Sequence, residues 1–319
     1  MLAILSSPDS FQKRNEMDKI RNVIKNEGSG VIHYEVKNFD DIGEALTRFN
    51  QCGITSLVIV GGQAIASATF EHIIENKPFG DYDVPISVLS GTADSFTSQS
   101  FGATSTNITA DLATILKKHN AGTLLNHLVK LPLMKVEGVA GVGKLYGLYF
   151  CTGEIVEQKS LFERILHKSG LKQTIQNYTT IASLLYKAYV GSKLSDNVDE
   201  MIRINRNQRG AVVGRYFMVN ITSLSWIFLG TKFPPRKNAD TLHFLSVENT
   251  KDAIMQTGKQ LMKGAYGEAF LPGHTLTEIE HARLVFHKNF VVDGRYYETD
   301  EAGELLITAS EKITFIRLD

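Results

Sequence analysis

The sequence is poor in cysteine, with Cys52 and Cys151 the only two in 319 residues. Two cysteines cannot form the disulfide framework of small secreted domains. Cys52 follows a predicted amphipathic helix and Cys151 ends a strand-like run, so we expect buried thiols. The chain also lacks net charge, because 34 basic residues balance 34 acidic ones. This balance gives no electrostatic reason to expect nucleic acid or an anionic membrane surface as a partner.

Long apolar runs are also missing. No stretch approaches the roughly 20 residues of a transmembrane helix, and the apolar residues 1–5 are too few, and lack the cationic flank, for a signal peptide. We therefore expect a cytoplasmic protein, of an oligomeric state that the sequence leaves open. The nine histidines and the carboxylates show no metal-ligand spacing such as HExxH, so no metal ligand is assigned.

The most informative stretch is residues 57–63, where four branched apolar residues run into Gly61 and Gly62. A short apolar run that ends in glycine is typical of a strand buried on both faces, as in a parallel sheet. Ligands of open α/β sheets bind at the carboxyl ends of strands, where glycine lets a backbone approach a phosphate. The alternative, that the glycine pair only relieves steric crowding, stays open at this point.

The first third of the chain alternates between strands and helices. Strands are expected at residues 2–5, 31–36, 57–60 and 84–89, and helices at about 11–27, 41–50 and 64–76. The strand at 84–89 also ends in a glycine-containing turn, residues 90–94. This spacing predicts βαβ units, a parallel sheet and two polar loops at the same sheet edge.

From about residue 130 the pattern changes to one dominated by strands. They are expected at residues 132–137, 144–151, 214–220, 242–247, 279–286, 290–293, 304–308 and 312–318, with helices at 181–189 and 250–262. The sequence therefore predicts an α/β N-terminal domain with a parallel sheet, residues 1–130, and a β-rich domain, residues 131–304.

The order of these pieces resembles the catalytic domain of the diacylglycerol kinase family, which includes bacterial lipid kinases and sphingosine kinases and is related to NAD kinases. The family pattern is Asn-Pro after the first strand, then GGDGT, then a GTxND-type loop, and a late DGE in a β-rich domain. The counterparts here are Ser7-Pro8 and the segments 61–65, 91–96 and 293–295. The resemblance covers nearly the whole chain and implies that the last strands, about 305–319, return to the first domain.

The resemblance also implies candidate site residues. For a nucleotide these are Ser7, Gly61, Gly62, Gln63, Gly91, Thr92 and Asp94. For catalysis they are Asp293 and Arg295, at the DGE position, with Glu298 as a carboxylate close in sequence. If the protein is active, the resemblance implies ATP and Mg²⁺ as cofactors and a lipid or other hydroxyl compound as acceptor.

The motifs have lost most of their functional side chains. The departures are Gln63, Ala64 and Ile65 within GGDGT, Asp94 and Ser95 within GTxND, Arg295 for the DGE glutamate, and Asn238-Ala239-Asp240 for an acidic loop tied in the family to Mg²⁺. The glycines and other backbone-shaping positions remain. The scaffold is therefore better preserved than the chemistry.

Phosphoryl transfer depends on positioning and charge neutralisation. Gln63 can form hydrogen bonds but cannot neutralise Mg²⁺, and Arg295, always protonated, cannot act as a general base. An arginine could instead stabilise a γ-phosphate. Glu298 could supply the lost carboxylate, the alternative being that it is a solvated charge at a strand end.

Three functions follow from these residues. The first is an ATP-dependent, lipid-kinase-like phosphotransferase with eroded motifs. The second is a non-catalytic relative that binds a nucleotide or a lipid and needs no cofactor. The third is an NAD-kinase-like enzyme, which is the weaker interpretation because the GGDG signature of that family is equally absent.

Overall fold

The computed structural model describes residues 1–8, 11, 14–90, 96–103, 107–157, 201–207, 210–227, 231–266 and 271–318. The chain divides into two compact units. Unit 1 comprises Met1–Leu131 and Glu311–Asp319, and unit 2 comprises Pro132–Ser310. Two segments of the chain therefore connect them, one after Leu131 and one after Ser310.

Unit 1 is built on a parallel sheet with the strand order β2-β1-β3-β4. Its elements are β1 (Leu2–Ser6), α1 (Arg14–Glu27), β2 (Val31–Glu35), α2 (Asp41–Gln51), β3 (Ser56–Val60), α3 (Gln63–Asn76), β4 (Ile86–Leu89), α4 (Phe96–Ser100), α5 (Ile108–Asn120) and the short 3₁₀ helix η2 (Leu124–Asn126). The end of β16 (Glu304–Ile316) joins this sheet, where Phe315 pairs with Ile86 of β4 in parallel.

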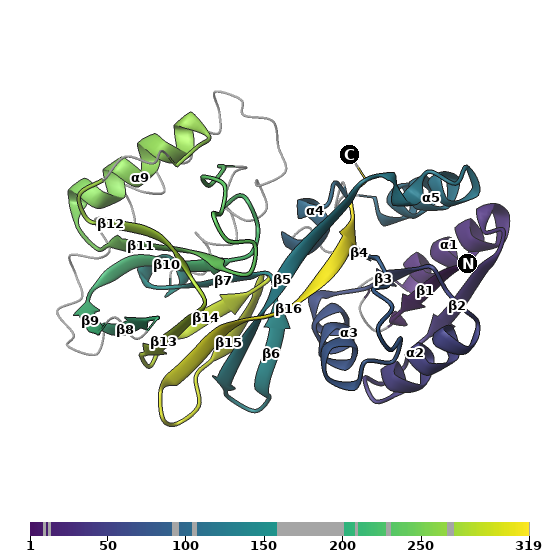
Figure 1. Cartoon of the computed structure of the whole chain (residues 1–319), viewed down its shortest axis with the longest axis horizontal. Helices are drawn as coiled ribbons and strands as arrows, with labels where there is room; N and C mark the ends of the chain where they lie inside the picture. Colours follow the sequence, from purple (N-terminus) through teal and green to yellow (C-terminus); the bar gives the residue numbers. More distant parts are fainter. Residues whose placement is uncertain are drawn as a thin grey trace. The chain divides into compact units, whose positions relative to one another are not determined.

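Helices cover both faces of the unit 1 sheet. Every residue of β3 is buried, and full burial of each branched apolar side chain contributes about 1.5–3 kcal/mol. Because alternate residues point to opposite faces of a strand, Val58 and Val60 pack with Ile20 of α1 and Leu112 of α5. In Figure 1, α2 and α3 lie on the other side of the strands.

Unit 2 consists mostly of antiparallel strands. Its elements are β5 (Leu128–Val139), which begins in unit 1, β6 (Gly143–Gly147), β7 (Tyr149–Thr152), α6 (Glu154–Glu157), β8 (Ile202–Arg206), β9 (Ala211–Gly214), β10 (Tyr216–Thr222), β11 (Leu242–Glu248), α9 (Lys251–Lys263), β12 (His274–Ile279), β13 (His281–Val285), β14 (Asn289–Val292) and β15 (Arg295–Glu298). One sheet has the order β12-β11-β10-β7-β14-β15. The other contains β16-β13-β8-β9, with β5 pairing β16 and β6.

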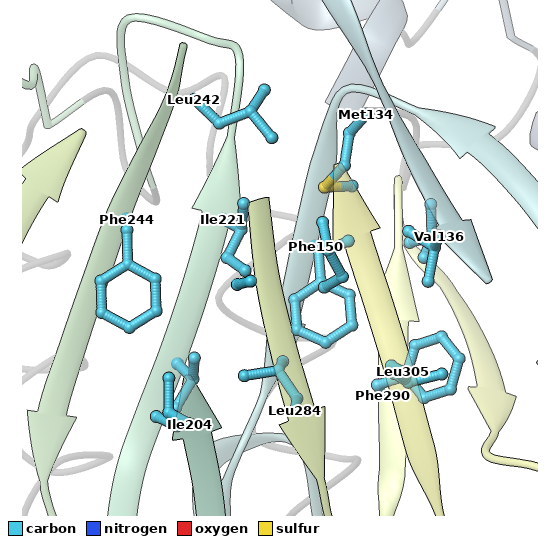
Figure 2. Close-up of a cluster of buried hydrophobic side chains, with 14 of the residues drawn as sticks. Met134, Val136, Phe150, Ile204, Ile221, Leu242, Phe244, Leu284, Phe290 and Leu305 are labelled. Atoms are coloured by element: carbon cyan, nitrogen blue, oxygen red, sulfur yellow. The ribbon is translucent and has the colours of Figure 1, made fainter. Parts of the chain in front are cut away.

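The core of unit 2 lies between these two sheets. Phe150, Phe244 and Phe290 come from the six-stranded sheet, and Leu284 and Leu305 from the other. Figure 2 shows these side chains gathered between the strands. All five are fully buried, so the core fixes the register of both sheets.

The predicted fold class is confirmed: an α/β part with a parallel sheet is followed by a β-rich part. Some boundaries were wrong. The predicted strands 304–308 and 312–318 form one strand, β16, because residues 309–311 continue the extended chain rather than turn. The predicted strand 279–286 is divided at Glu280 between β12 and β13, which belong to different sheets.

The prediction for the cysteines is half right. Cys151 is buried, but Cys52 is exposed. The reason is that α2 ends at Gln51 and Cys52 is its C-terminal cap, in the turn that leads to Gly53 with φ 65°. The predicted helix at residues 181–189 lies outside the described residues.

Candidate functional site

Three strands of unit 1 end at the same level. Ser6 of β1 pairs with Val60 of β3, which pairs with Leu89 of β4. The Ser7 N–H donates to the Val60 carbonyl (3.2 Å), and the Gly61 N–H donates to the Leu89 carbonyl (2.9 Å). Ser7 and Gly61 are therefore neighbours at the carboxyl edge of the sheet, and both are buried, as the parallel arrangement predicts.

Helix α3 starts at this edge. Gly62 is its N-terminal cap with an extended backbone (φ −79°, ψ 176°), and Gln63 is its first residue. The cap residue Gly62 makes no side-chain hydrogen bond and the first turn of α3 holds no acid, whereas the Asn107 side chain caps α5. A helix N-terminus carries partial positive charge on its N–H groups. This end of α3 is suited to an anion such as a phosphate.

The second predicted glycine-containing loop, after β4, lies outside the described residues. It contains Gly91, Thr92 and Asp94. Ser90, which directly follows β4, is described and is buried. The contribution of the 91–94 loop to a nucleotide site stays a prediction.

A serine–histidine pair lies at the end of β1. Ser6 Oγ and His33 Nε2 are 2.8 Å apart. Burial lowers the pKa of His33, and nearby Glu35 only partly opposes this. Arg21 donates two hydrogen bonds to Glu35, both 2.7 Å. Ser6 has no exposed surface, so this pair orders the strand ends and does not present a nucleophile.

Asp293, a predicted catalytic residue, is a buried backbone anchor in unit 2. It has φ 49° and Gly294 has φ 93°, which makes them the turn of the β14–β15 hairpin. The Asp293 carboxylate accepts the N–H of Leu148 (3.1 Å) and of Tyr149 (2.8 Å). The approach is so close that a Cβ on Gly147 would lie 2.6 Å from Asp293 Oδ2.

The other two predicted catalytic residues lie on β15. Both Arg295 and Glu298 are exposed, and the Arg295 guanidinium lies 5.4 Å from the centre of the Tyr297 ring. Residues three apart on a strand point to opposite faces, so β15 does not bring Arg295 and Glu298 together. Neither side chain shares the buried surroundings of Asp293.

Solved structures with a similar arrangement of strands and helices are known. A diacylglycerol kinase from Bacillus anthracis str. Sterne is 13% identical, with a TM-score of 0.57 over 99% of this chain and 96% of that chain. The chain has the diacylglycerol-kinase fold. Two structures of a protein from the same strain, proposed to be a diacylglycerol kinase, are each 12% identical, with TM-scores of 0.60 and 0.61 over the same shares.

Comparison at the level of sequence finds no relative of this chain. No protein-family model and no curated protein matches the chain. At 12–13% identity the likeness shows the diacylglycerol-kinase fold alone, so any chemistry must be argued from the residues of this chain. Among the described residues, no helix has the length and apolar character needed to cross a membrane.

The residues do not fit the Mg²⁺ that the diacylglycerol-kinase fold implies. The described part of the chain holds no group of three or more histidines, cysteines or carboxylates that could bind a metal. At the loop 238–240, the N–H groups of Lys237 and Asn238 point at the carboxylate of Glu278, at 2.7 and 3.1 Å. Converging N–H donors surround an anion rather than a cation, so no step is assigned to a metal held by this loop.

A separate cavity of about 230 Å³ lies within unit 1, at the opposite end of α3 and β4 from the glycines. Its lining includes Lys77, Asp83, Lys130 and Glu311. The charges are internally paired, Lys77 with Glu311 at 3.1 Å and Lys130 with Asp83 at 2.5 Å. It contains none of the predicted site residues.

Sequence reasoning overlooked three residues that shape these regions. Ser90 and His33 become neighbours of the strand ends only through the parallel pairing, which no local pattern reveals. Glu278 acts on a loop about 40 positions earlier in the chain. An Asp-Gly pair between two apolar runs is, however, a known hairpin signal, and it could have identified the turn at Asp293.

Proposed function

We propose that the protein is a lipid-kinase-like nucleotide-binding protein. It binds the phosphates of ATP at the carboxyl edge of the parallel sheet in unit 1. The observation that supports this most directly is the start of α3, where Gly61 and Gly62 follow a buried strand and the cap residue, a glycine, makes no side-chain hydrogen bond to the helix. Backbone N–H groups at such an end bind phosphate oxygens without needing a cationic side chain.

The proposal includes the loss of carboxylate catalysis. Gln63 replaces the acid of GGDGT, and Arg295 replaces the proposed base. The remaining acid, Asp293, is occupied with two backbone N–H groups. A general base typically contributes on the order of 10²–10⁴ to a rate, so we expect phosphate transfer to diacylglycerol to be slow or absent.

A negative charge at the start of α3 tests the nucleotide site. Gln63→Glu places a carboxylate in the first turn, where it interacts favourably with the helix dipole and repels a phosphate. We expect the melting temperature to be kept and the affinity for ATP, measured by calorimetry in EDTA, to fall about tenfold. ADP and NAD are titrated alongside, because preference for NAD would favour the NAD-kinase-like alternative.

Asn76→Asp is the matched control. It makes the same charge change at the other end of α3, about 20 Å away at 1.5 Å per residue, which exceeds the screening length of about 10 Å at 0.1 M salt. ATP affinity should be unchanged in this variant. Equal affinities of Gln63→Glu and the unmodified protein, or equal losses in both variants, would contradict the placement of the phosphates.

An active phosphotransferase is the second candidate. The observation that favours it is the exposed guanidinium of Arg295 on β15, available to a phosphate group. Arginine binds phosphates through paired N–H donors and can stabilise charge during transfer. A radiolabelled phosphate-transfer assay on a panel of lipids and small hydroxyl compounds separates this candidate from the binding protein.

A further inference from the structure

A carboxylate of β12 closes the turn that precedes β11. Glu278 Oε1 accepts the N–H of Lys237 (2.7 Å), and Oε2 accepts the N–H of Asn238 (3.1 Å) and the hydroxyl of Thr241 (2.8 Å). The same Thr241 hydroxyl lies 2.7 Å from the Asn238 carbonyl. Both oxygens of one side chain therefore bind the loop at three points.

Two further contacts complete this loop. Asn238 Oδ1 accepts the N–H of Asp240 (2.9 Å), and Arg236 donates to the carbonyl of Thr241 (2.9 Å). Thr241 is buried, whereas Asn238 and Asp240 are exposed. The inner side of the loop thus presents hydrogen-bond donors to Glu278, and the oxygen atoms of Asn238 already serve the loop itself.

We propose that Glu278 holds the 236–241 loop in place of a divalent cation, so that this loop keeps its conformation without Mg²⁺. The proposal rests on whether the loop is built to surround a positive or a negative charge. A cation needs converging oxygen atoms, whereas this loop directs N–H groups inward, and their partner is the negative charge of Glu278. Glu278 is a positioning residue, and this role is independent of nucleotide binding in unit 1.

Glu278→Gln tests the role by removing the charge while keeping the shape. The amide oxygen can still accept hydrogen bonds, but the NH₂ group that replaces the other oxygen faces a backbone N–H donor of the loop. We expect the melting temperature to fall by about 5 °C. Hydrogen exchange of a peptide covering residues 236–241 should become at least about tenfold faster, while peptides from unit 1 are unchanged. Thr241→Val, which removes one of the contacts, should show a smaller effect of the same kind.

The control is Glu280→Gln, two positions further along the chain. Glu280 is also an acid, but it is exposed. This variant should keep the melting temperature and the exchange pattern. If Glu278→Gln and Glu280→Gln behave alike, the role assigned to Glu278 is wrong.

The metal response is measured on the unmodified full chain. Melting temperature and exchange of the 236–241 peptide are compared in excess EDTA and in excess MgCl₂. We expect no difference, because a ligand stabilises a protein only if it binds the native state. A higher melting temperature and slower exchange of this peptide in MgCl₂ would overturn the proposal, since they would show that the loop binds a cation after all.

Discussion

The two units end their strands in different ways. In unit 1 the strand β3 runs into Gly61 and Gly62, and α3 begins there with a glycine as its cap residue. In unit 2, Asp293 and Glu278 each accept at least two backbone N–H groups at a turn. At these turns unit 2 satisfies backbone N–H groups with its own carboxylates, whereas the cap residue of α3 in unit 1 is a glycine with no side chain to do so.

The presence of Asp293 in its turn can be explained by structure alone. The turn at Asp293 needs a residue that tolerates positive φ and a carboxylate that satisfies buried N–H groups. Those are structural demands, and Asp293 meets them whatever residue stands at position 295. An acid retained in a motif is therefore weak evidence for catalysis unless its oxygens are available to a substrate.

The largest effect is expected from Asp293→Asn. Asparagine also tolerates positive φ, so the variant removes the charge while keeping the turn. Its NH₂ group opposes one of the donors from Leu148 and Tyr149, and a buried unsatisfied donor costs about 1–3 kcal/mol, more where a charged acceptor is lost. We expect the free energy of unfolding in urea to fall by about 3 kcal/mol.

Asp300→Asn is the comparison for that variant. Asp300 is exposed and accepts the N–H of Ala302 within a surface turn, so the same change should cost less than about 1 kcal/mol. If Asp293→Asn were equally mild, Asp293 would not be the anchor of the β14–β15 turn. Its carboxylate would then be available for another task, and the contrast between the units would weaken.

An effect of similar size is expected from pH. His243 of β11 is buried and stacks on Phe233, with ring centres 4.8 Å apart. Burial, and then the charge of Arg236, lower the pKa of His243 to about 4, while Glu278 opposes them. The unfolded chain therefore binds a proton below about pH 6.5 that the folded chain does not bind until about pH 4. Stability should fall by up to about 3 kcal/mol as the pH drops through this window.

His243→Phe keeps the ring stack and removes this titration. Chemical unfolding of both proteins between pH 7 and pH 4 should give curves that diverge as the pH falls, with the variant losing less stability. Parallel curves would mean that His243 accepts its proton in the folded state at an ordinary pH. His33 in unit 1 is present in both proteins, so its own lowered pKa cancels from the difference.

Local pattern was sufficient for the scaffold of unit 1. The branched apolar run of β3 and the glycines after it predict a buried strand and its turn, and the alternation with helices predicts parallel pairing. The position of Ser7 beside Gly61 follows from that pairing without further information. These features depend on residues close together in the sequence.

The hydrogen bonds that Asp293 and Glu278 of unit 2 accept from backbone N–H groups could not be predicted from local sequence patterns. Asp293 acts on Leu148 and Tyr149, which lie about 145 positions away. Glu278 reaches its loop only because β12 pairs with β11. The family motif indicated catalysis for Asp293, but a motif records which residue is present and not which atoms its oxygens contact.

The smallest structural effect is expected from Arg295→Ala, which nevertheless decides between an enzyme and a binding protein. Arg295 is exposed, and its described contact is with the Tyr297 ring, an interaction that contributes about 0.5–1 kcal/mol at such sites. The variant should therefore fold normally, with a melting temperature within about 2 °C of the unmodified protein. Any change in activity can then be attributed to the guanidinium itself.

Radiolabelled transfer from Mg-ATP to diacylglycerol and a panel of other hydroxyl acceptors supplies the readout. We expect little transfer by either protein, because on the proposed match to the family motifs Gln63 and Arg295 stand where carboxylates would act. The paired change Gln63→Asp with Arg295→Glu should increase transfer more than either change alone, since the effects of groups that act together are not additive.

Robust transfer by the unmodified protein, abolished by Arg295→Ala, would contradict the proposal that the protein binds a nucleotide without transferring phosphate efficiently. Arg295 would then be the group that stabilises charge in the transition state. Because Glu298 points to the opposite face of β15, the base would then be a residue other than Glu298.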